Sequence, residues 1–282
     1  MKRIVVPTDF SPTAERAFQY ALDIAAKSGA AVILYHVYEP VESEFIDNVT
    51  KRRLYNEQME SDLMKQLQRL THKFVPADFS VPVSTILGRA PVVDNILGFA
   101  EHNQIDLVVM GTQGAGGLKR ALVGTIASRI IKQADCPVLL IPEKFDWKLP
   151  AQIVYATDCM APDRTAFNLV LSLAKLYEAK ITVVHMIHGD AGETNLDQES
   201  GFFEKYAHAL QQDYSDFTIS FELVKTVSMV DAMERLHQEL PYDMVVMVRR
   251  EKHFLQRFFV ESFTKNMLYT TSQPLLVIPE DF

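Results

Sequence analysis

Ile4–Asp9 (IVVPTD) is the stretch that decides the fold, because the chain repeats it as Ile153–Asp158 (IVYATD). Two later stretches also recur, namely Asp106–Met110 as Asp243–Met247 and Pro137–Pro142 as Pro274–Pro279. Matches that keep a steady register within each half indicate one structural unit used twice. The two later stretches recur after a shorter interval along the chain than the first stretch does, so the second copy has lost residues from its middle.

The length of the chain agrees with two copies. At 282 residues it suits two domains of about 140 residues, each large enough to bury a core of its own. We place the first domain at residues 1–143 and the second at residues 150–282. The stretch between them, Glu143–Pro150, is short and polar and ends in proline, which favours a linker.

Short β-branched stretches alternate with longer amphipathic ones in each half. In the first half, strands are predicted at Arg3–Val6, Ala31–His36, Ser80–Ile86, Asp106–Met110 and Pro137–Ile141. Helices are predicted near Pro12–Ser28, Glu44–Lys73, Ala90–Asn103 and Thr125–Ala134, and in the second half near Arg164–Tyr177, Gly201–Asp213 and Val230–Gln238. The strands are almost continuously apolar, as parallel strands buried on both faces must be. This pattern predicts an α/β fold of two tandem doubly wound domains, with any ligand at the carboxyl ends of the strands.

Composition narrows the class of protein. Apolar residues make up 48% of the chain and charged residues 23%, the proportions of an ordinary globular protein. No segment has the roughly 18 uninterrupted apolar residues of a spanning helix, and the N-terminus lacks the apolar core of a signal peptide. The two cysteines, Cys136 and Cys159, have no disulfide or metal-binding spacing. These features favour a cytoplasmic protein with reduced thiols and no membrane contact.

Charge limits the partners further. The net charge of −8 argues against nucleic acid, because neutralising its phosphates needs a basic surface. A single anionic ligand is still admissible, since backbone N–H groups at the start of a helix can hold one. The eight histidines show no paired spacing on one helix, so a metal site is unsupported.

Val109–Leu118 (VMGTQGAGGL), which leads to Gly124 and Thr125, carries the strongest functional signal. It begins where a buried strand ends and finishes where a helix begins. Gly111 and Gly114 allow the backbone to turn sharply and to approach a ligand where a Cβ would collide. Gly124 and Thr125 stand at the start of the next helix, whose free N–H groups and positive dipole end favour phosphate oxygens. The alternative is a tight turn without a ligand, although such a turn needs fewer glycines.

Two other glycine motifs do not fit. A dinucleotide-binding fingerprint that began at Gly114 would need glycine at Lys119, and the turn after the first strand has no glycine. The Walker motif requires glycine, lysine and a hydroxyl residue in succession, which the chain lacks. The loop therefore belongs to another class of phosphate-binding sequence.

The spacing of these glycines resembles the ATP-binding signature of the universal stress protein family. Two residues separate Gly111 from Gly114, nine separate Gly114 from Gly124, and a threonine follows directly. Val6–Ser11 is similar to the first strand and turn of that family, and Leu34–Val37 to its second strand. The likeness covers nearly the whole chain, in two copies. It implies a tandem form with five-stranded parallel sheets, of the adenine nucleotide alpha hydrolase-like type, and ATP at the strand ends.

The resemblance also implies a role for each residue of the site. Asp9 and the backbone of Val37 would hold the adenine side, Pro7 and Thr8 would line the pocket, Met110, Gly111 and Gly114 would approach the ribose and phosphates, and Gly124, Thr125 and Ile126 would take the phosphates. Asp9 follows the first strand, as a ligand-facing carboxylate should, but its side chain could instead cap the helix near Pro12. No catalytic residue or metal ligand is implied, and whether Mg²⁺ accompanies ATP is left open.

The second half departs from this signature. Val248 stands opposite Gly111, Glu251 opposite Gly114, Glu261 opposite Gly124 and Ser262 opposite Thr125. The two glutamates would stand where the phosphates of ATP should lie, and like charges about 4 Å apart repel by roughly 4 kcal/mol at an effective dielectric constant near 20. Arg249, Arg250 and Lys252 could offset this, but we expect them to pair with the glutamates. We therefore predict that only the first domain binds ATP, and that Asp158 and His185 are remnants or structural.

Three functions fit the sequence. The first is an ATP-binding, regulatory stress-response protein without dedicated catalysis, since Gln113 is the only polar side chain of the loop besides its threonines. Weak ATP hydrolysis or self-phosphorylation, known in relatives, cannot be read from these residues. The second is an enzyme of the ATP pyrophosphatase or adenylating ligase class, which carries a Ser-Gly-Gly-x-Asp-Ser type loop where this chain has Pro7–Ser11. The third is an interaction module without nucleotide.

Strand edges indicate how the domains could associate. The resemblance implies pairing through the last strand of each domain, Pro137–Ile141 and Pro274–Ile278, whose edge backbone groups can bond to a neighbour. The two halves could pair within one chain, or two chains could form a homodimer, and the sequence leaves both open. His36 and His185 occupy equivalent strand positions, where a hydrogen-bonded core role is expected before a catalytic one.

Overall fold

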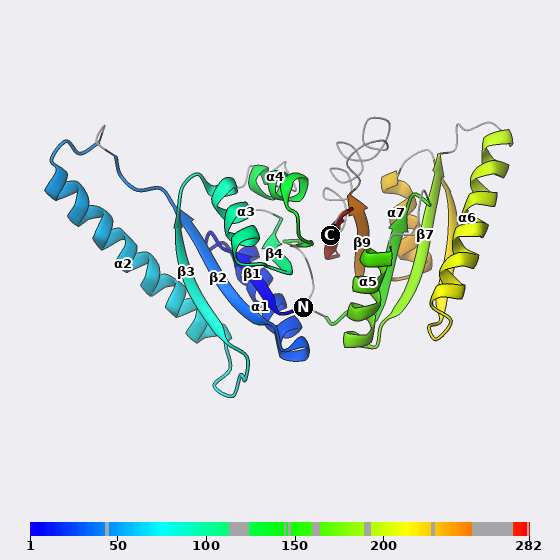
Figure 1. The fold of residues 1–282 in the computed structure, drawn as a ribbon, viewed down its shortest axis with the longest axis horizontal. Coiled ribbons are helices and arrows are strands. Elements are labelled where there is room, and N and C mark those ends of the chain that lie inside the picture. Colours follow the sequence, from blue (N-terminus) through cyan, green and yellow to red (C-terminus); the bar gives the residue numbers. More distant parts are fainter. Residues whose placement is uncertain are drawn as a thin grey trace. The chain divides into compact units, whose positions relative to one another are not determined.

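The computed structural model describes residues 1–42, 45–112, 124–143, 145, 148–159, 164–188, 193–226, 229–249, 273–280 and 282. It divides into two compact units, Met1–Glu143 (unit 1) and Lys144–Phe282 (unit 2). Strands and helices alternate along each unit (Figure 1). Within the described residues, none of the helices combines the length and apolar character needed to cross a bilayer.

Unit 1 is a doubly wound sheet. Its strands are β1 (Arg3–Pro7), β2 (Ala31–Tyr38), β3 (Val83–Arg89), β4 (Leu107–Gly111) and β5 (Val138–Ile141). They lie in the order β3-β2-β1-β4-β5, and every neighbouring pair is parallel. The central strand is fully buried at Ile4, Val5 and Val6, because helices cover both faces of the sheet.

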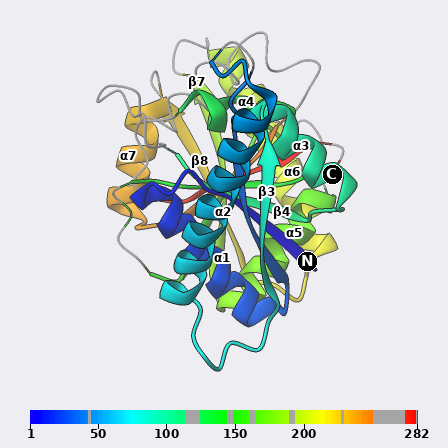
Figure 2. The same cartoon turned by 90° about the vertical axis from the view of Figure 1, so that its left-hand side faces the viewer.

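The helices of unit 1 are α1 (Pro12–Ser28), α2 (Val49–Phe74), α3 (Val92–His102) and α4 (Thr125–Gln133). The first two share one face, where the Phe18 and Phe74 rings meet edge to face, and α2 lies along β3 (Figure 2). The last two contact each other on the other face. This two-sided winding confirms the predicted fold class.

Unit 2 repeats the same topology. Its strands are β6 (Gln152–Thr157), β7 (Lys180–His188), β8 (Ile219–Thr226), β9 (Met244–Arg249) and β10 (Leu275–Pro279). Their order, β8-β7-β6-β9-β10, matches unit 1 strand for strand, and again each neighbouring pair is parallel. The described helices are α5 (Arg164–Tyr177), α6 (Glu193–Asp213) and α7 (Met229–Glu239).

Local signals set the helix ends. The Ser11 hydroxyl accepts a hydrogen bond from the Ala14 N–H at 3.2 Å, and Gly29 ends α1 at φ 74°, as the sequence predicts. The second helix begins later than predicted, at Val49 rather than Glu44, because Asn48 caps it by accepting from the Lys51 N–H at 3.0 Å.

A carboxylate that binds the start of the central strand is also duplicated. Asp106 accepts hydrogen bonds from the N–H groups of Lys2 and Arg3, at 2.6 and 2.8 Å. Asp243, its counterpart in unit 2, accepts from Ala151 and Gln152 at 2.8 and 2.9 Å. Each carboxylate thereby ties the start of the central strand to the strand beside it. The sequence repeat paired these two residues but gave no sign of this role.

Candidate functional site

The strand order of unit 1 creates one place where the winding reverses. The chain leaves β1 for β2 on one side, and later returns to place β4 on the other side. At such a point the loops that follow the two central strands diverge, and open parallel sheets bind ligands in the crevice between them, which we therefore expect at the carboxyl ends of β1 and β4. Thr8 and Asp9 follow β1 at this point, and Thr112 follows β4.

The turn after β1 is held by its own polar groups. The Thr8 hydroxyl oxygen accepts from the Phe10 N–H at 3.1 Å, and the Asp9 carboxylate accepts from the Ser11 N–H at 3.1 Å. Phe10 takes a positive φ of 63°, which turns the chain sharply into α1. Ser11, not Asp9, is therefore the cap of α1, and the Asp9 side chain stays exposed.

The start of α4 is tied to the end of β4. The Gly124 N–H donates to the Thr112 carbonyl oxygen at 2.7 Å, and the Thr112 N–H donates to the Ile141 carbonyl oxygen at 3.0 Å. The first bond along α4 runs from the Ser128 N–H to the Gly124 carbonyl oxygen, at 3.1 Å. The N–H groups of residues 125–127 precede that bond, and α4 has no side-chain cap. Three amides at the positive end of this helix thus have no acceptor along the helix.

The predicted site residues differ in exposure. Asp9, Thr125 and Ile126 are exposed, Val37, Gly111 and Gly124 are half-buried, and Pro7, Thr8 and Met110 are buried. Gly114 lies outside the described residues.

Gly111 is needed for a different reason from the one the sequence suggested. A Cβ added there would lie 2.7 Å from Thr13 Cγ2 and 3.0 Å from the Thr13 carbonyl carbon. The space that glycine leaves is thus filled by α1, not kept open for a ligand. Likewise, the Gly124 N–H is already bonded to Thr112, so the neighbouring amides of α4 are the ones that can donate.

Gly111→Ala is expected to destabilise unit 1 by about 1–3 kcal/mol, because backbone atoms of α1 cannot move away cheaply. Gly98→Ala is the matched control: it lies inside α3, and a Cβ there meets nothing within 4 Å. The control should raise stability by about 0.5–1 kcal/mol. Urea unfolding measures both, and equal effects would contradict the packing role of Gly111.

Unit 2 reproduces the turn after the first strand. His36 Nδ1 lies 2.7 Å from the Thr8 carbonyl oxygen, and His185 Nδ1 lies 2.9 Å from that of Thr157. The Cys159 N–H donates to the Thr157 hydroxyl at 3.1 Å, with φ 59° at Cys159, as at Phe10. Each histidine is therefore a structural donor to the turn, in line with the core role predicted for both.

The family model for the universal stress proteins matches this chain twice, at residues 1–142 and 151–279. The chain belongs to the universal stress protein family. The two matches correspond to the two repeats of the sequence, so this universal stress protein has the tandem form that the sequence repeat predicted.

Similar proteins resemble one half or the whole. Universal stress protein MJ0531 of Methanocaldococcus jannaschii is 34% identical over 142 residues, 50% of this chain and 81% of that protein. Universal stress protein MJ0577 of the same organism is 26% identical over 163 residues, 51% of this chain and 96% of that protein. A universal stress protein from Archaeoglobus fulgidus has a TM-score of 0.72 at 13% identity, covering 98% of this chain and 96% of the other. This last likeness shows the fold.

The second copy in this universal stress protein differs where β4 is matched by β9. Val248 replaces Gly111 and is half-buried, and Arg249 beside it is buried. Glu251, Glu261 and Ser262 lie outside the described residues, so their placement stays a prediction. Among the residues that the structure describes, no group of three or more histidine, cysteine, aspartate or glutamate side chains could hold a metal ion.

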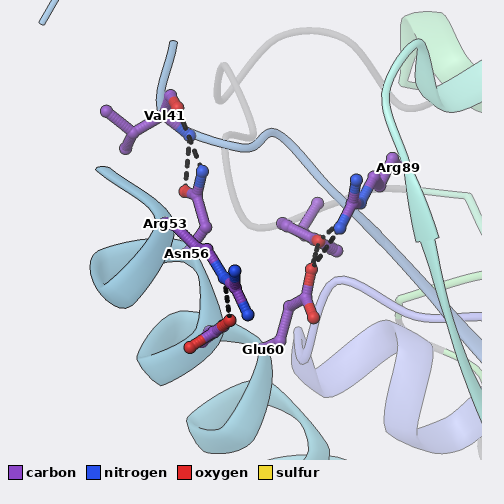
Figure 3. A network of polar contacts seen from close by, with 7 residues as sticks. Val41, Arg53, Asn56, Glu60 and Arg89 are labelled. Atoms are coloured by element: carbon purple, nitrogen blue, oxygen red, sulfur yellow. Dashed lines mark hydrogen bonds and ion pairs between the residues drawn. The ribbon is translucent and has the colours of Figure 1, made fainter. Parts of the chain in front are cut away.

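A polar network that the sequence analysis missed holds the chain after β2 (Figure 3). The Asn56 side chain of α2 accepts from the Val41 N–H at 2.9 Å and donates to the Val41 carbonyl oxygen at 3.1 Å. One turn further on, Glu60 binds Arg89 of β3 at 2.8 Å and accepts from the Tyr38 hydroxyl. The hydrogen bonds from Tyr38 and Arg89 hold the pKa of Glu60 below its usual value.

Asn56→Ala is expected to free the segment after β2, at a cost of about 1 kcal/mol in stability, because both main-chain bonds to Val41 are lost. Amide hydrogen exchange at Val41 should become faster. Arg53→Ala is the control, since it removes only an exposed pair with Glu57 one turn away and should change stability little. If the Val41 amide kept its protection in Asn56→Ala, this network would not hold the segment.

Proposed function

We propose that unit 1 of this universal stress protein binds ATP at the carboxyl ends of β1 and β4, and that binding serves a regulatory role in the stress response. One observation carries the proposal: the bond from Gly124 to Thr112 brings the start of α4 to the point where the winding reverses. The amides of residues 125–127, which have no acceptor along α4, then lie beside the end of β4, where phosphate oxygens are well held.

The residues of unit 1 fit such a ligand in two groups. Asp9 is exposed at the end of β1 and, with the main chain of Val37, can accept from or donate to an adenine ring. The Thr125 hydroxyl and the amides of α4 supply donors for the phosphates. Pro7, Thr8, Met110 and Gly111 stand at the ends of β1 and β4 and would line the site, and Gly114, which lies outside the described residues, belongs to the same glycine signature.

We further propose that unit 2 does not bind ATP. The turn after β6 in unit 2 is built like the turn after β1. The residues proposed to hold adenine therefore do not explain why only unit 1 would bind ATP. The difference lies in the phosphate side, where two glutamates replace glycines of the signature. Their charge would oppose a triphosphate.

The first test asks what the protein carries. Protein purified without added nucleotide is denatured, and the released small molecules are identified by mass spectrometry. We expect an adenine nucleotide, in an amount not above one per chain. Protein that carries no nucleotide and shows no heat on titration with ATP would refute the proposal. An interaction module without nucleotide would then be the remaining function.

Catalysis is a separate question with its own control. We propose no dedicated enzyme activity, and the turn after β1 supports this, because the Thr8 hydroxyl and the Asp9 carboxylate both accept hydrogen bonds from backbone N–H groups of the turn itself. Turnover of radiolabelled ATP should therefore stay near that of a variant that cannot bind the nucleotide. A cytoplasmic location and pairing through the last strands, within the chain or in a homodimer, are likewise proposals.

A further inference from the structure

A cavity in unit 2 has no counterpart in the proposed ATP site. It has a volume of about 400 Å³, opens to solvent, and lies between β8 and α7, which contact each other. Its polar lining comprises Thr182, Ser220, Glu222, Lys225, Arg235 and Glu239. The strand β8 is the edge of the unit 2 order on this side, next to β7.

Unit 1 is packed differently in the corresponding region. There the Tyr35 ring stacks on Phe99 of α3, with ring centroids 4.4 Å apart. The sheet register pairs Pro7 with Tyr35 in unit 1 and Ala156 with Val184 in unit 2, so a valine takes the place of the tyrosine. In α7, which has the same length as α3, a leucine takes the place of Phe99. The two rings are thus absent from unit 2, and Val224 stands there in place of Gly88, the residue that the Tyr35 ring covers in unit 1.

The residues around the vacated space have also become polar. In matching positions, Ile33 is replaced by Thr182, Ile86 by Glu222, Gly98 by Arg235 and His102 by Glu239. If unit 2 had only lost the volume of the two rings, the residues around the space would be expected to stay apolar. Instead, three charged side chains were introduced around one cavity, and both signs of charge are present.

The charges are arranged along the cavity. The Arg235 guanidinium donates to the Lys225 carbonyl oxygen at 3.2 Å, which places the guanidinium at the carboxyl end of β8. The Lys225 side chain lies on the other face of the strand, the face on which Phe221 contacts Phe203 of α6, so Lys225 lines the cavity through its main chain. Because α7 runs back along the sheet, Glu239 in its last turn lies toward the start of β8. The ion pairs described in unit 2 are formed by other residues. One end of the cavity is therefore basic and the other acidic.

We propose that this cavity binds a small zwitterion, an α-amino acid with an aliphatic side chain. Its carboxylate would bind the Arg235 guanidinium, and its ammonium group would bind Glu222 and Glu239. The aliphatic side chain would lie over Leu236, on the apolar floor of the cavity. A simple anion or cation would leave the opposite charge of the cavity unmatched. The site is separate from the ATP crevice, so neither proposal depends on the other.

The test titrates the isotope-labelled full chain with L-leucine, L-isoleucine and L-valine and follows backbone resonances by NMR. We expect at least one of the three to shift resonances of β8 and α7 and not those of unit 1. 3-Methylbutylamine and 4-methylpentanoate, which each lack one of the two charges, should bind at least about tenfold more weakly. No shift with any of the three, or equal binding of the singly charged compounds, would overturn the proposal.

Variants localise the binding. Arg235→Gln, which keeps the helix propensity, should weaken amino acid binding about tenfold or more. Leu236→Phe, which restores the residue of unit 1, should weaken it by filling the cavity. Glu234→Gln is the matched control, because this exposed residue lies on the same helix outside the cavity. Unchanged binding in both test variants, with the native spectrum retained, would show that the amino acid binds elsewhere.

Discussion

Gly124→Glu is expected to abolish ATP binding by unit 1 and to leave the fold intact. The residue caps α4 with φ −65° and ψ 154°, a conformation open to any amino acid. A carboxylate at the start of α4 is favourable for the helix itself. About 4 Å from a phosphate, however, it costs roughly 4 kcal/mol, close to a thousandfold in affinity. Titration calorimetry measures the loss, and circular dichroism checks the fold.

The control for this prediction is Gly124→Gln. It has the size of the glutamate without the charge, so it should weaken binding by no more than a few fold. The same glutamate stands at this position in the second copy, as Glu261, and Gly114→Glu makes the matching change at the other glycine. Retention of parental affinity in Gly124→Glu would show that the phosphates lie elsewhere.

Asp243→Ala is expected to lower the stability of unit 2 by about 2–4 kcal/mol, because it leaves buried backbone donors without an acceptor. Asp243 is only 5% exposed. Besides the N–H groups of Ala151 and Gln152, its carboxylate binds the Lys148 ammonium group. Chemical unfolding, followed by fluorescence and by hydrogen exchange at β6, measures the change.

The first copy supplies the control for Asp243. Asp106→Ala removes the same pair of main-chain bonds in unit 1, but Asp106 is half-buried. Water can replace the lost acceptor there, so we expect a smaller cost of about 1 kcal/mol. A loss at Asp106 as large as that at Asp243 would mean that burial does not set the effect.

The fold was largely readable from the sequence because its signals are local or repeated. Apolar stretches gave the strands, Ser11 and Pro12 gave the start of α1, and the repeat gave two domains with one topology. Boundaries were less certain where the signal was weak. The charged stretch from Glu44 looks helical in composition, but Asn48 is the residue that caps α2.

The site was only partly predictable, because its geometry depends on distant contacts. Glycine at position 111 suggested a close ligand, whereas Thr13 of α1 fills the space beside it. Nor does the sequence show that Asn56 of α2 binds the main chain at Val41, since the partner is a backbone group. Long-range packing and side-chain to main-chain bonds of this kind carry no pattern in the sequence.

The two copies of this universal stress protein keep their framework and differ at the positions where we propose that ligands bind. The turns at Thr8 and Thr157 and the carboxylates at Asp106 and Asp243 are duplicated. The glycines of the signature are not duplicated, nor are the residues between the third strand of each sheet and the helix that follows it. Such a division favours two units with separate ligands on one scaffold.

Calorimetric titration of ATP into the full chain tests the central claim most directly, because it counts sites as well as measuring affinity. The account predicts one ATP per polypeptide, and none in Gly124→Glu. Two equivalent sites per polypeptide, or a single site that persists in that variant, would contradict it.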